Sequence, residues 1–275
     1  MVPFVHTPIV STIDPASIGA VIEASVNARL LSFSGTPGGL LHDDPSLVWA
    51  DSGVFDGNLN SVVSAHLAAD NVDDQIEAVI AYFRARSRAF TWHIGPSTKP
   101  ADLADALIAH GLTLRESEPG MAIEIDRMRE DLEIPAELTI ETVHDAASLA
   151  DWVSVWLPPV AEDVRRRQFS ALLSLGVDET LPWQYFVGRL NGEPVATSEI
   201  FLSAGVAAVH QVVTMPSARR RGIGTAMTLK VLSEARDRGY RVGVLTASPA
   251  GQGVYRRIGF AEYCWFHRYS WRPGA

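Results

Sequence analysis

The sequence predicts an α/β (α+β) protein with a mixed, mostly antiparallel twisted sheet flanked by helices. From about residue 135 the patterns run β-α-α-β-β-β-α-β-α-β, an order that combines antiparallel hairpins with a crossover connection. Asn191-Gly192 stands between two alternating segments and is the strongest short hairpin signal of the chain. Hydrophobic residues form 47% and charged residues 20% of the 275 residues, which is enough for a sizeable core.

In the first half, residues 1 to about 45 show no regular pattern and end in a glycine-rich loop. Alternation then predicts strands at 47–53 and 59–67. Residues 70–86 begin with acids, place apolar residues at helical spacing and end in arginines, as a helix does. A strand at 88–96, a helix at 99–112 and a strand at 120–128 complete this half.

The charged segment 129–138 contains Pro135 and has no apolar period, so it predicts a domain boundary that divides the chain into 1–134 and 135–275. The later patterns predict, in order, strand 138–144, helices 145–157 and 160–176, strands 183–190, 193–202 and 206–216, helix 223–239, strand 240–248, helix 250–259 and strand 260–271. Pro158 and Pro159 are expected to stop the first of these helices.

Residues 88–126 and 240–271 both run strand, proline-containing turn, helix, glycine, strand. This parallel suggests an internal repeat, and two unrelated α/β endings are the alternative. The first half carries no loop rich in arginine and glycine, so a copy there has lost any anion site.

The totals exclude some function classes. A formal net charge of -9 argues against nucleic acid and anionic membrane as partners and leaves room for a cationic substrate. Cys264 is the single cysteine, so there is no intrachain disulfide and no cysteine-rich zinc site; we expect it in the core or on the sheet rather than as a nucleophile. No leader or membrane-spanning pattern is visible, so we expect a soluble, cytoplasmic protein.

The stretch SARRRGIGTAM, residues 217–227, lies where a strand ends and a helix begins. Free N–H groups and the positive dipole end at a helix N-terminus bind anions, and glycines allow a phosphate to approach the backbone. The arginines add positive charge around this loop. It lacks the lysine of a Walker loop, and Met227 stands where a dinucleotide fingerprint has its third glycine.

The pattern R-x-x-G-x-G, formed by Arg219, Gly222 and Gly224, resembles the acetyl-CoA loop of the GNAT N-acetyltransferase superfamily. The strand and the proline before the loop, and GVYRRIGF about thirty residues later, add to the resemblance, which covers about 135–275. It implies a catalytic GNAT domain at 135–275 with the acyl-CoA N-acyltransferase fold, and a degenerate GNAT-like domain without a CoA loop at 1–134. The alternative interpretation of the arginines is a solvent-exposed turn without a ligand.

The resemblance implies acetyl-CoA as cosubstrate, with the diphosphate on the loop N–H groups and the pantetheine beside the preceding strand. The implied coenzyme-binding residues are Val212, Val213, Thr214, Arg219, Arg220, Arg221, Gly222, Ile223, Gly224, Thr225, Ser248 and Tyr255. Ser248 departs from the family pattern, because many members carry an asparagine there and make one more contact to the pantetheine arm.

The resemblance also implies the catalytic groups. Tyr255 matches the tyrosine that protonates the departing sulfur in many members. His210 lies where related enzymes often carry a base, and its ordinary pKa near 6.5 suits neutral pH. Glu199 on the neighbouring strand is the rival base, and a water chain without a dedicated base is a third reading.

The expected acceptor is a small molecule with a primary amine or amino group, and no metal is implied because the histidines show no ligand spacing. Trp152, Trp156 and Trp183 either line the acceptor pocket or belong to the core, and Glu162 with Asp163 either faces the amine or only begins a helix. The alternative functions are a non-catalytic acyl-CoA-binding regulatory module and a binder of another phosphate ligand. The oligomeric state, a homodimer included, is left open.

Overall fold

The computed structural model describes residues 7–54, 57, 59–157 and 160–274. Its strands form one 11-stranded sheet in the order β1-β2-β3-β4-β11-β5-β10-β9-β8-β7-β6. The strands are β1 (Leu40–Asp44), β2 (Leu47–Asp51), β3 (Ser61–Ala65), β4 (Phe90–Ile94), β5 (Thr113–Glu124), β6 (Leu138–Thr142), β7 (Trp183–Leu190), β8 (Glu193–Ser203), β9 (Val206–Thr214), β10 (Val242–Thr246) and β11 (Ala261–Trp271).

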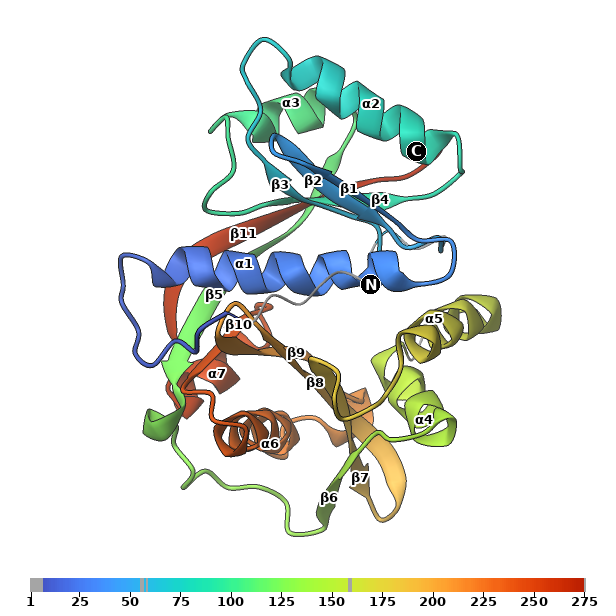
Figure 1. The fold of residues 1–275 in the computed structure, drawn as a ribbon. Helices are drawn as coiled ribbons and strands as arrows, with labels where there is room; N and C mark the ends of the chain where they lie inside the picture. The colour runs from blue at the N-terminus through green and yellow to red at the C-terminus, as the bar shows by residue number, and fades with distance from the viewer. Residues whose placement is uncertain (1–6, 55–56, 58, 158–159, 275) are drawn as a thin grey trace.

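Helices cover this sheet on both faces (Figure 1). The α-helices are α1 (Ile18–Leu31), α2 (Val72–Arg84), α3 (Leu103–Ala109), α4 (Ala146–Trp156), α5 (Glu162–Leu175), α6 (Ile223–Asp237) and α7 (Gln252–Ile258). Short 3-10 turns lie at η1 (Ser32–Gly35), η2 (Ile125–Arg127) and η3 (Pro216–Ala218). The predicted fold class is confirmed: all pairings are antiparallel except β3 with β4 and β9 with β10.

The two halves of the chain exchange their last strands. Strand β5 of the first half pairs with β10, and β11 of the second half pairs with β4. The strands β5 and β11 also pair with each other, so the order β4-β11-β5-β10 is symmetrical about their contact. Figure 1 shows both strands running from one half of the molecule into the other.

This symmetry agrees with the suspected internal repeat. In each half a parallel pair of strands is followed by a helix and then by the exchanged strand: β4, α3 and β5 in the first half, β10, α7 and β11 in the second. The proposed boundary near residue 134 falls between β5 and β6, where the chain forms neither helix nor strand. The division into domains 1–134 and 135–275 stays a prediction.

Helix α1 was not predicted, because its sequence shows no regular apolar period. It crosses between the two halves in Figure 1 and contacts β3, β5, β8 and β9. Its buried residues include the polar Glu23, Ser25 and Arg29 beside the apolar Ile18 and Ile22. Polar side chains with distant partners therefore take positions that an amphipathic pattern would assign to apolar residues.

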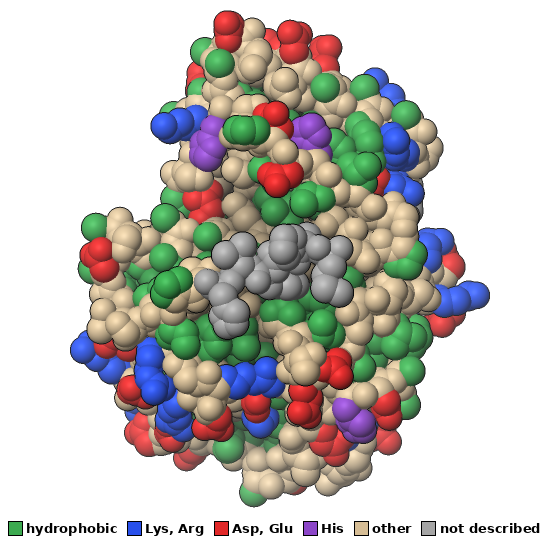
Figure 2. Space-filling model, in the orientation of Figure 1, with side chains coloured by type: hydrophobic (Ala, Val, Ile, Leu, Met, Phe, Trp, Pro, Cys, Tyr) green, Lys and Arg blue, Asp and Glu red, His purple; other side chains and the backbone are tan. Residues whose placement is uncertain are grey.

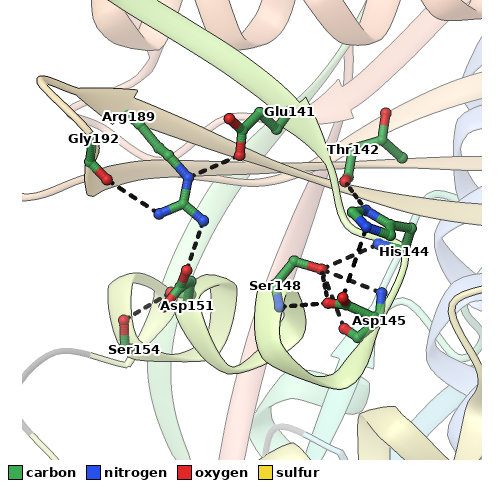
Figure 3. Close-up of polar contacts among 9 residues, drawn as sticks. All are labelled: Glu141, Thr142, His144, Asp145, Ser148, Asp151, Ser154, Arg189 and Gly192. Atoms are coloured by element: carbon green, nitrogen blue, oxygen red, sulfur yellow. Dashed lines mark hydrogen bonds and ion pairs between the residues drawn. The ribbon is translucent and has the colours of Figure 1, made fainter.

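Helix α4 is held by polar contacts at its N-terminus and at Asp151 (Figure 3). The Asp145 carboxylate accepts a hydrogen bond from the Ser148 N–H at 2.8 Å, which caps the helix N-terminus. From β7, Arg189 donates to Asp151 of the helix at 2.6 Å and to Glu141 of β6 at 2.9 Å (Figure 3). The helix ends at Trp156, and the prolines expected to stop it, Pro158 and Pro159, lie outside the described residues.

Two further expectations concern membrane-spanning helices and the reactivity of Cys264. None of the helices in the described ranges is long and apolar enough to span a bilayer. Cys264 lies half-buried on β11, and burial raises the pKa of its thiol to about 11, which disfavours the nucleophilic thiolate.

Candidate functional site

The arginine-glycine loop forms a backbone cradle at the start of α6. Arg220 has a φ of 60° and Gly222 a φ of 80°, so the loop has two left-handed residues, a backbone geometry that can form an anion-binding hollow. Gly222 is the N-cap, and the N–H groups of the first turn have no partner within the helix. Only glycine fits at position 222, because an added Cβ would lie 2.5 Å from the carbonyl oxygen of Glu133.

This cradle opens into a cavity of about 650 Å³, which we call the loop cavity. It is lined by Val212, Val213, Thr214, Ala218, Arg219, Arg220, Gly222, Ile223, Gly224, Thr225, Ser248, Ala250, Gly251, Gly253, Val254, Tyr255 and Arg257. The structure therefore brings together every predicted coenzyme-binding residue except Arg221. Their contact with a coenzyme stays a prediction.

The side chains of the loop divide between the cavity and the surface. The described residues that line the loop cavity include three arginines and no Asp or Glu, so the cavity favours an anion. Arg219 Nε donates to the Thr214 carbonyl at 3.0 Å and thereby closes the loop. Arg221 points away, with Nη2 3.0 Å from Glu137 Oε1.

Three further residues of the lining were not predicted from the sequence: Gly251, Gly253 and Arg257. The positive charge of Arg257, two residues after Tyr255, is the feature of the sequence that could have indicated it. Gly251 gives the Tyr255 ring its place, because an added Cβ would stand 2.7 Å from Cε2 of that ring. The phenol is largely buried, and burial, with the Glu118 charge, raises the pKa of Tyr255 to about 12. Tyr255 therefore keeps its proton at neutral pH.

Strands β9 and β10 separate at the level of the loop cavity. They pair in parallel at Ala207 with Gly243 and at Ala208 with Val244, and pairing stops there. Three residues later Gln211 takes a φ of 50°, and β9 bulges against β8, where the register shifts between Thr197 and Glu199. At this point β9 also borders a second cavity.

The second cavity has a volume of about 430 Å³ and lies between the two halves of the chain; we call it the interface cavity. Its lining includes Arg29, His93, Glu118, His210, Thr246 and Arg268. His210 and Gln211 line the interface cavity, whereas Val212 lines the loop cavity. The linings of the two cavities therefore adjoin where β9 and β10 diverge.

His210 faces the interface cavity and not the loop cavity. Its Nε2 is buried and has no hydrogen-bond partner among the residues described. Burial and the charges of Arg29 and Arg268 lower the pKa of His210 to about 3, so the imidazole is neutral but is a weak base in this buried setting. The assignment of His210 as base stays a prediction.

Glu199, the rival base, is fully buried and lines neither cavity. Both of its carboxylate oxygens accept from Arg29, at 2.5 and 2.7 Å. The same charge contributes, after burial, to a raised pKa of the neighbouring Tyr185. Glu199 therefore sits in an ion pair that joins α1 to β8, and its role as base also stays a prediction.

The remaining predicted pocket residues lie in three places: the core, the interface cavity and the surface. Trp152 and Trp183 are buried in the core, whereas Trp156 lines the interface cavity and donates from Nε1 to Gln211 Oε1 at 2.8 Å. Glu162 and Asp163 are exposed in the first turn of α5, and each pairs with an arginine of its own helix. Within the described ranges, no group of three or more His, Cys, Asp or Glu could hold a metal ion; the expectation of no metal stays a prediction.

Residues 149–260 match the model of the acetyltransferase (GNAT) family. Over 110 residues the chain is 30% identical to glucosamine 6-phosphate N-acetyltransferase 1 of Oryza sativa subsp. japonica. The aligned stretch covers 38% of this chain and 67% of that protein. Over 88 residues it is 35% identical to an uncharacterised N-acetyltransferase of Methanocaldococcus jannaschii; that stretch is 28% of this chain and spans only 39% of the relative's length. The chain belongs to the GNAT acetyltransferase family.

Solved structures agree over almost the whole chain. A GCN5-related N-acetyltransferase from Kribbella flavida superposes with a TM-score of 0.71 at 21% identity, over 94% of this chain and 97% of that one. A tandem GNAT protein from the clavulanic acid biosynthesis pathway gives 0.56 at 15% identity, over 98% of both chains. The predicted family resemblance is confirmed, and these structures share the fold over 94% and 98% of the chain.

Proposed function

We propose that the protein transfers an acetyl group from acetyl-CoA to a primary amine of a small acceptor. The family to which the chain belongs uses acetyl-CoA, and the two curated relatives described above are named N-acetyltransferases. The observation that carries the proposal is that two cavities are lined by neighbouring residues of β9 where it diverges from β10. A thioester in one cavity and an amine in the other would come together there.

The loop cavity fits the coenzyme. Its left-handed residues and the N-terminus of α6 suit the diphosphate, and Arg219, Arg220 and Arg257 suit its charge. The backbone of Val212, Val213 and Thr214 lies open on the bulged strand, where an extended pantetheine arm with amide groups would pair as another strand does. Both features favour a ligand with a diphosphate and an amide-containing arm.

The transfer itself needs one proton acceptor and one proton donor. The lone pair of the neutral amine attacks the thioester carbonyl, the new C–N bond forms and the C–S bond breaks. We assign to His210 Nε2, directly or through water, the uptake of the proton that the amine loses, because this nitrogen has no partner among the described residues. The Tyr255 hydroxyl gives its proton to the departing thiolate, and its raised pKa means that the phenol is protonated at neutral pH.

The first half fits the role of a degenerate copy that binds no coenzyme. Its parallel strands β3 and β4 and the helix α2 correspond in order to β9, β10 and α6. The connection from β3 to α2, residues 66–71, contains neither glycine nor arginine, and Asp73 and Asp74 occupy the first turn of α2. Acidic side chains also gather on the upper surface in Figure 2. Negative charge at that helix N-terminus opposes a diphosphate.

Two measurements test the proposal. Isothermal titration should detect binding of CoA and acetyl-CoA, and ATP or NAD should not compete; competition would favour another phosphate ligand. Thiol release from acetyl-CoA with a panel of primary amines should then exceed the rate without amine. CoA binding without thiol release on any amine would leave the non-catalytic regulatory module, and absence of CoA binding would overturn the proposal.

A further inference from the structure

We propose that the acceptor carries, besides its amine, an anionic group, either a carboxylate or a phosphate, and binds in the interface cavity with the amine inward. This inference rests on the proposed acetyl transfer and names the substrate class of the same site. Three features of the cavity carry it: the division of charge along its length, two buried histidine nitrogens and a bulge in β5.

One cluster of charged side chains in the cavity runs from the buried Glu118 to the half-exposed Glu116 and has an excess of negative charge. Arg268 Nη2 contacts Glu118 Oε2 and lies 2.8 Å from Glu116 Oε2, so one guanidinium faces two carboxylates. Glu118 is buried, and its charge contributes to the raised pKa of Tyr255, so it lies toward the point where the linings of the two cavities adjoin. The three groups together carry one net negative charge, which attracts the ammonium form of the acceptor.

Two histidines of the cavity each have a buried ring nitrogen without a partner among the described residues. Nε2 of His93 and Nε2 of His210 are inaccessible to solvent, and neither has a hydrogen-bond partner among the described residues. Burial first, and then the charge of Arg268, lowers the pKa of His93 to about 3, and His210 is neutral for similar reasons. Buried polar atoms are normally paired, so these nitrogens indicate a polar ligand in the cavity.

The outer part of the cavity has an excess of positive charge. Arg115 and Arg272 line the cavity and are exposed, and neither makes an ion pair or hydrogen bond with any residue the structure describes. Arg29 adds no free charge, because Glu199 neutralises it. An anionic group at the mouth would meet two unpaired guanidinium groups.

A bulge brings Arg115 to the cavity. On β5 and β11, Arg268 pairs with Glu116 and Tyr269 pairs with Leu114, so Arg115 is the extra residue of β5. In a regular strand Arg115 and Glu116 would point to opposite faces, yet both line the cavity. The backbone irregularity therefore adds a cation to the mouth. The lining also includes Trp156 and Phe266, which suit an apolar body between the two charged groups.

A matched set of acceptors tests this assignment in the full-length protein. Tyramine and 4-(2-aminoethyl)benzamide have neutral ends, whereas 4-(2-aminoethyl)benzoate and O-phosphotyramine have anionic ends on the same amine. We expect kcat/KM for the anionic amines to exceed that for the neutral ones by about tenfold or more. The ranking of benzoate against phosphate identifies which anion the mouth prefers. Equal kcat/KM on all four amines would overturn the assignment.

The double variant Arg115→Gln/Arg272→Gln should reduce this preference to less than about threefold, through a loss of kcat/KM on the anionic amines. The matched control Arg241→Gln removes an exposed arginine that lines neither cavity and should keep the full preference. An unchanged preference in the double variant would contradict the role of these arginines.

A binding titration of the same four amines on the CoA-bound protein gives a readout without turnover. Tighter binding of the anionic amines supports the assignment, and equal binding or none by either anionic amine overturns it. Failure here together with normal CoA binding and acetylation of other amines would leave the proposed function intact. Failure to bind CoA would instead remove the proposed function.

Discussion

Arg29 on α1 and Glu199 on β8 form a bidentate ion pair in the protein interior, with Nε–Oε1 at 2.5 Å and Nη2–Oε2 at 2.7 Å. The two residues are 170 positions apart, so the pair ties the first helix to the sheet of the second half. Burial alone would lower the pKa of Arg29, but the Glu199 charge and hydrogen bonds raise it above its ordinary value. Both groups therefore remain charged, and each depends on the other.

Removal of one partner of this pair should strongly destabilise the fold. Glu199→Gln and Arg29→Met each leave an uncompensated buried charge, and we expect each to lower the free energy of unfolding by about 3–5 kcal/mol. Urea denaturation followed by tryptophan fluorescence measures this loss. The double variant Arg29→Met/Glu199→Gln should lose much less than the sum of the two; simple additivity of two small losses would contradict the inferred coupling.

Tyr255→Phe should reduce kcat by about 100-fold or more and change the CoA dissociation constant by less than about twofold, because only the proton donor is lost. The control Tyr240→Phe alters a tyrosine that lines neither cavity and should leave kcat unchanged. Steady-state kinetics and isothermal titration give the two numbers. Equal losses of turnover and of CoA affinity would remove Tyr255 from the acid role.

The buried histidines predict a loss of stability at mildly acidic pH. His93 has a pKa of about 3 in the folded protein and an ordinary value near 6.5 when unfolded, so the unfolded chain binds more protons between these values. The stability it contributes is complete above about pH 7 and is lost as the pH falls below about 6.5; by pH 5 the loss is about 2 kcal/mol.

The variant His93→Gln removes this proton uptake. The difference in unfolding free energy between pH 7.5 and pH 5 should therefore shrink by about 2 kcal/mol relative to the unaltered protein. The control His144→Gln changes an exposed histidine and should leave the difference as it is. A His93→Gln variant with the full pH dependence would show that His93 is not buried in neutral form.

The parts of the fold that could be predicted depend on neighbours in the chain. The loop from Arg219 to Gly224, the Asn191-Gly192 turn and the capped helix α4 each rest on a few consecutive residues, and the structure has all three features as expected. Twelve predicted coenzyme-binding residues lay within one contiguous half, and the structure gathers all but Arg221 around one cavity. Local spacing was sufficient for these because a loop and its helix form together.

The parts that could not be predicted depend on distant partners. Arg29 pairs with Glu199, and Glu118 pairs with Arg268 across 150 positions of sequence. The burial of these polar residues of α1 and β5 could therefore not be predicted without knowledge of their partners. The exchange of β5 and β11 also leaves no trace in the alternation of either strand. The residues of the first half that line the interface cavity were not predicted, because they come together with the second half only through these long-range pairings.

The two glycines of the loop should respond differently to alanine. At Gly222 the positive φ and the nearby Glu133 carbonyl oppose any Cβ, so Gly222→Ala should lower the unfolding free energy by about 2 kcal/mol or more. At Gly224 an added Cβ has only Thr214 Oγ1 within 4 Å, at 3.9 Å, so Gly224→Ala should fold normally.

The Gly224 methyl group would instead occupy the space proposed for the diphosphate. We expect the CoA dissociation constant of Gly224→Ala to rise about tenfold or more, with an unfolding midpoint within about 1 °C of the parent in the absence of ligand. Thermal unfolding and isothermal titration separate the two effects. Unaltered CoA affinity in a normally folded Gly224→Ala protein would contradict the placement of the diphosphate.

Trp156 links α4 to the bulge at which the linings of the two cavities adjoin, through the 2.8 Å hydrogen bond from its Nε1 to Gln211 Oε1. The Thr197 hydroxyl holds the same residue by donating to the Gln211 carbonyl at 2.8 Å. Trp156→Phe removes the first contact, and we expect it to lower kcat several-fold together with a stability loss of about 1 kcal/mol.

The matched control is Trp183→Phe, which removes a donor to the Gly176 carbonyl away from both cavities. It should lose similar stability and keep kcat, because its hydrogen bond does not touch β9. If both variants lose kcat in proportion to stability, Trp156 acts only through the fold. A selective loss in Trp156→Phe would instead show that the left-handed backbone at Gln211 must be held in place for the thioester and the amine to meet.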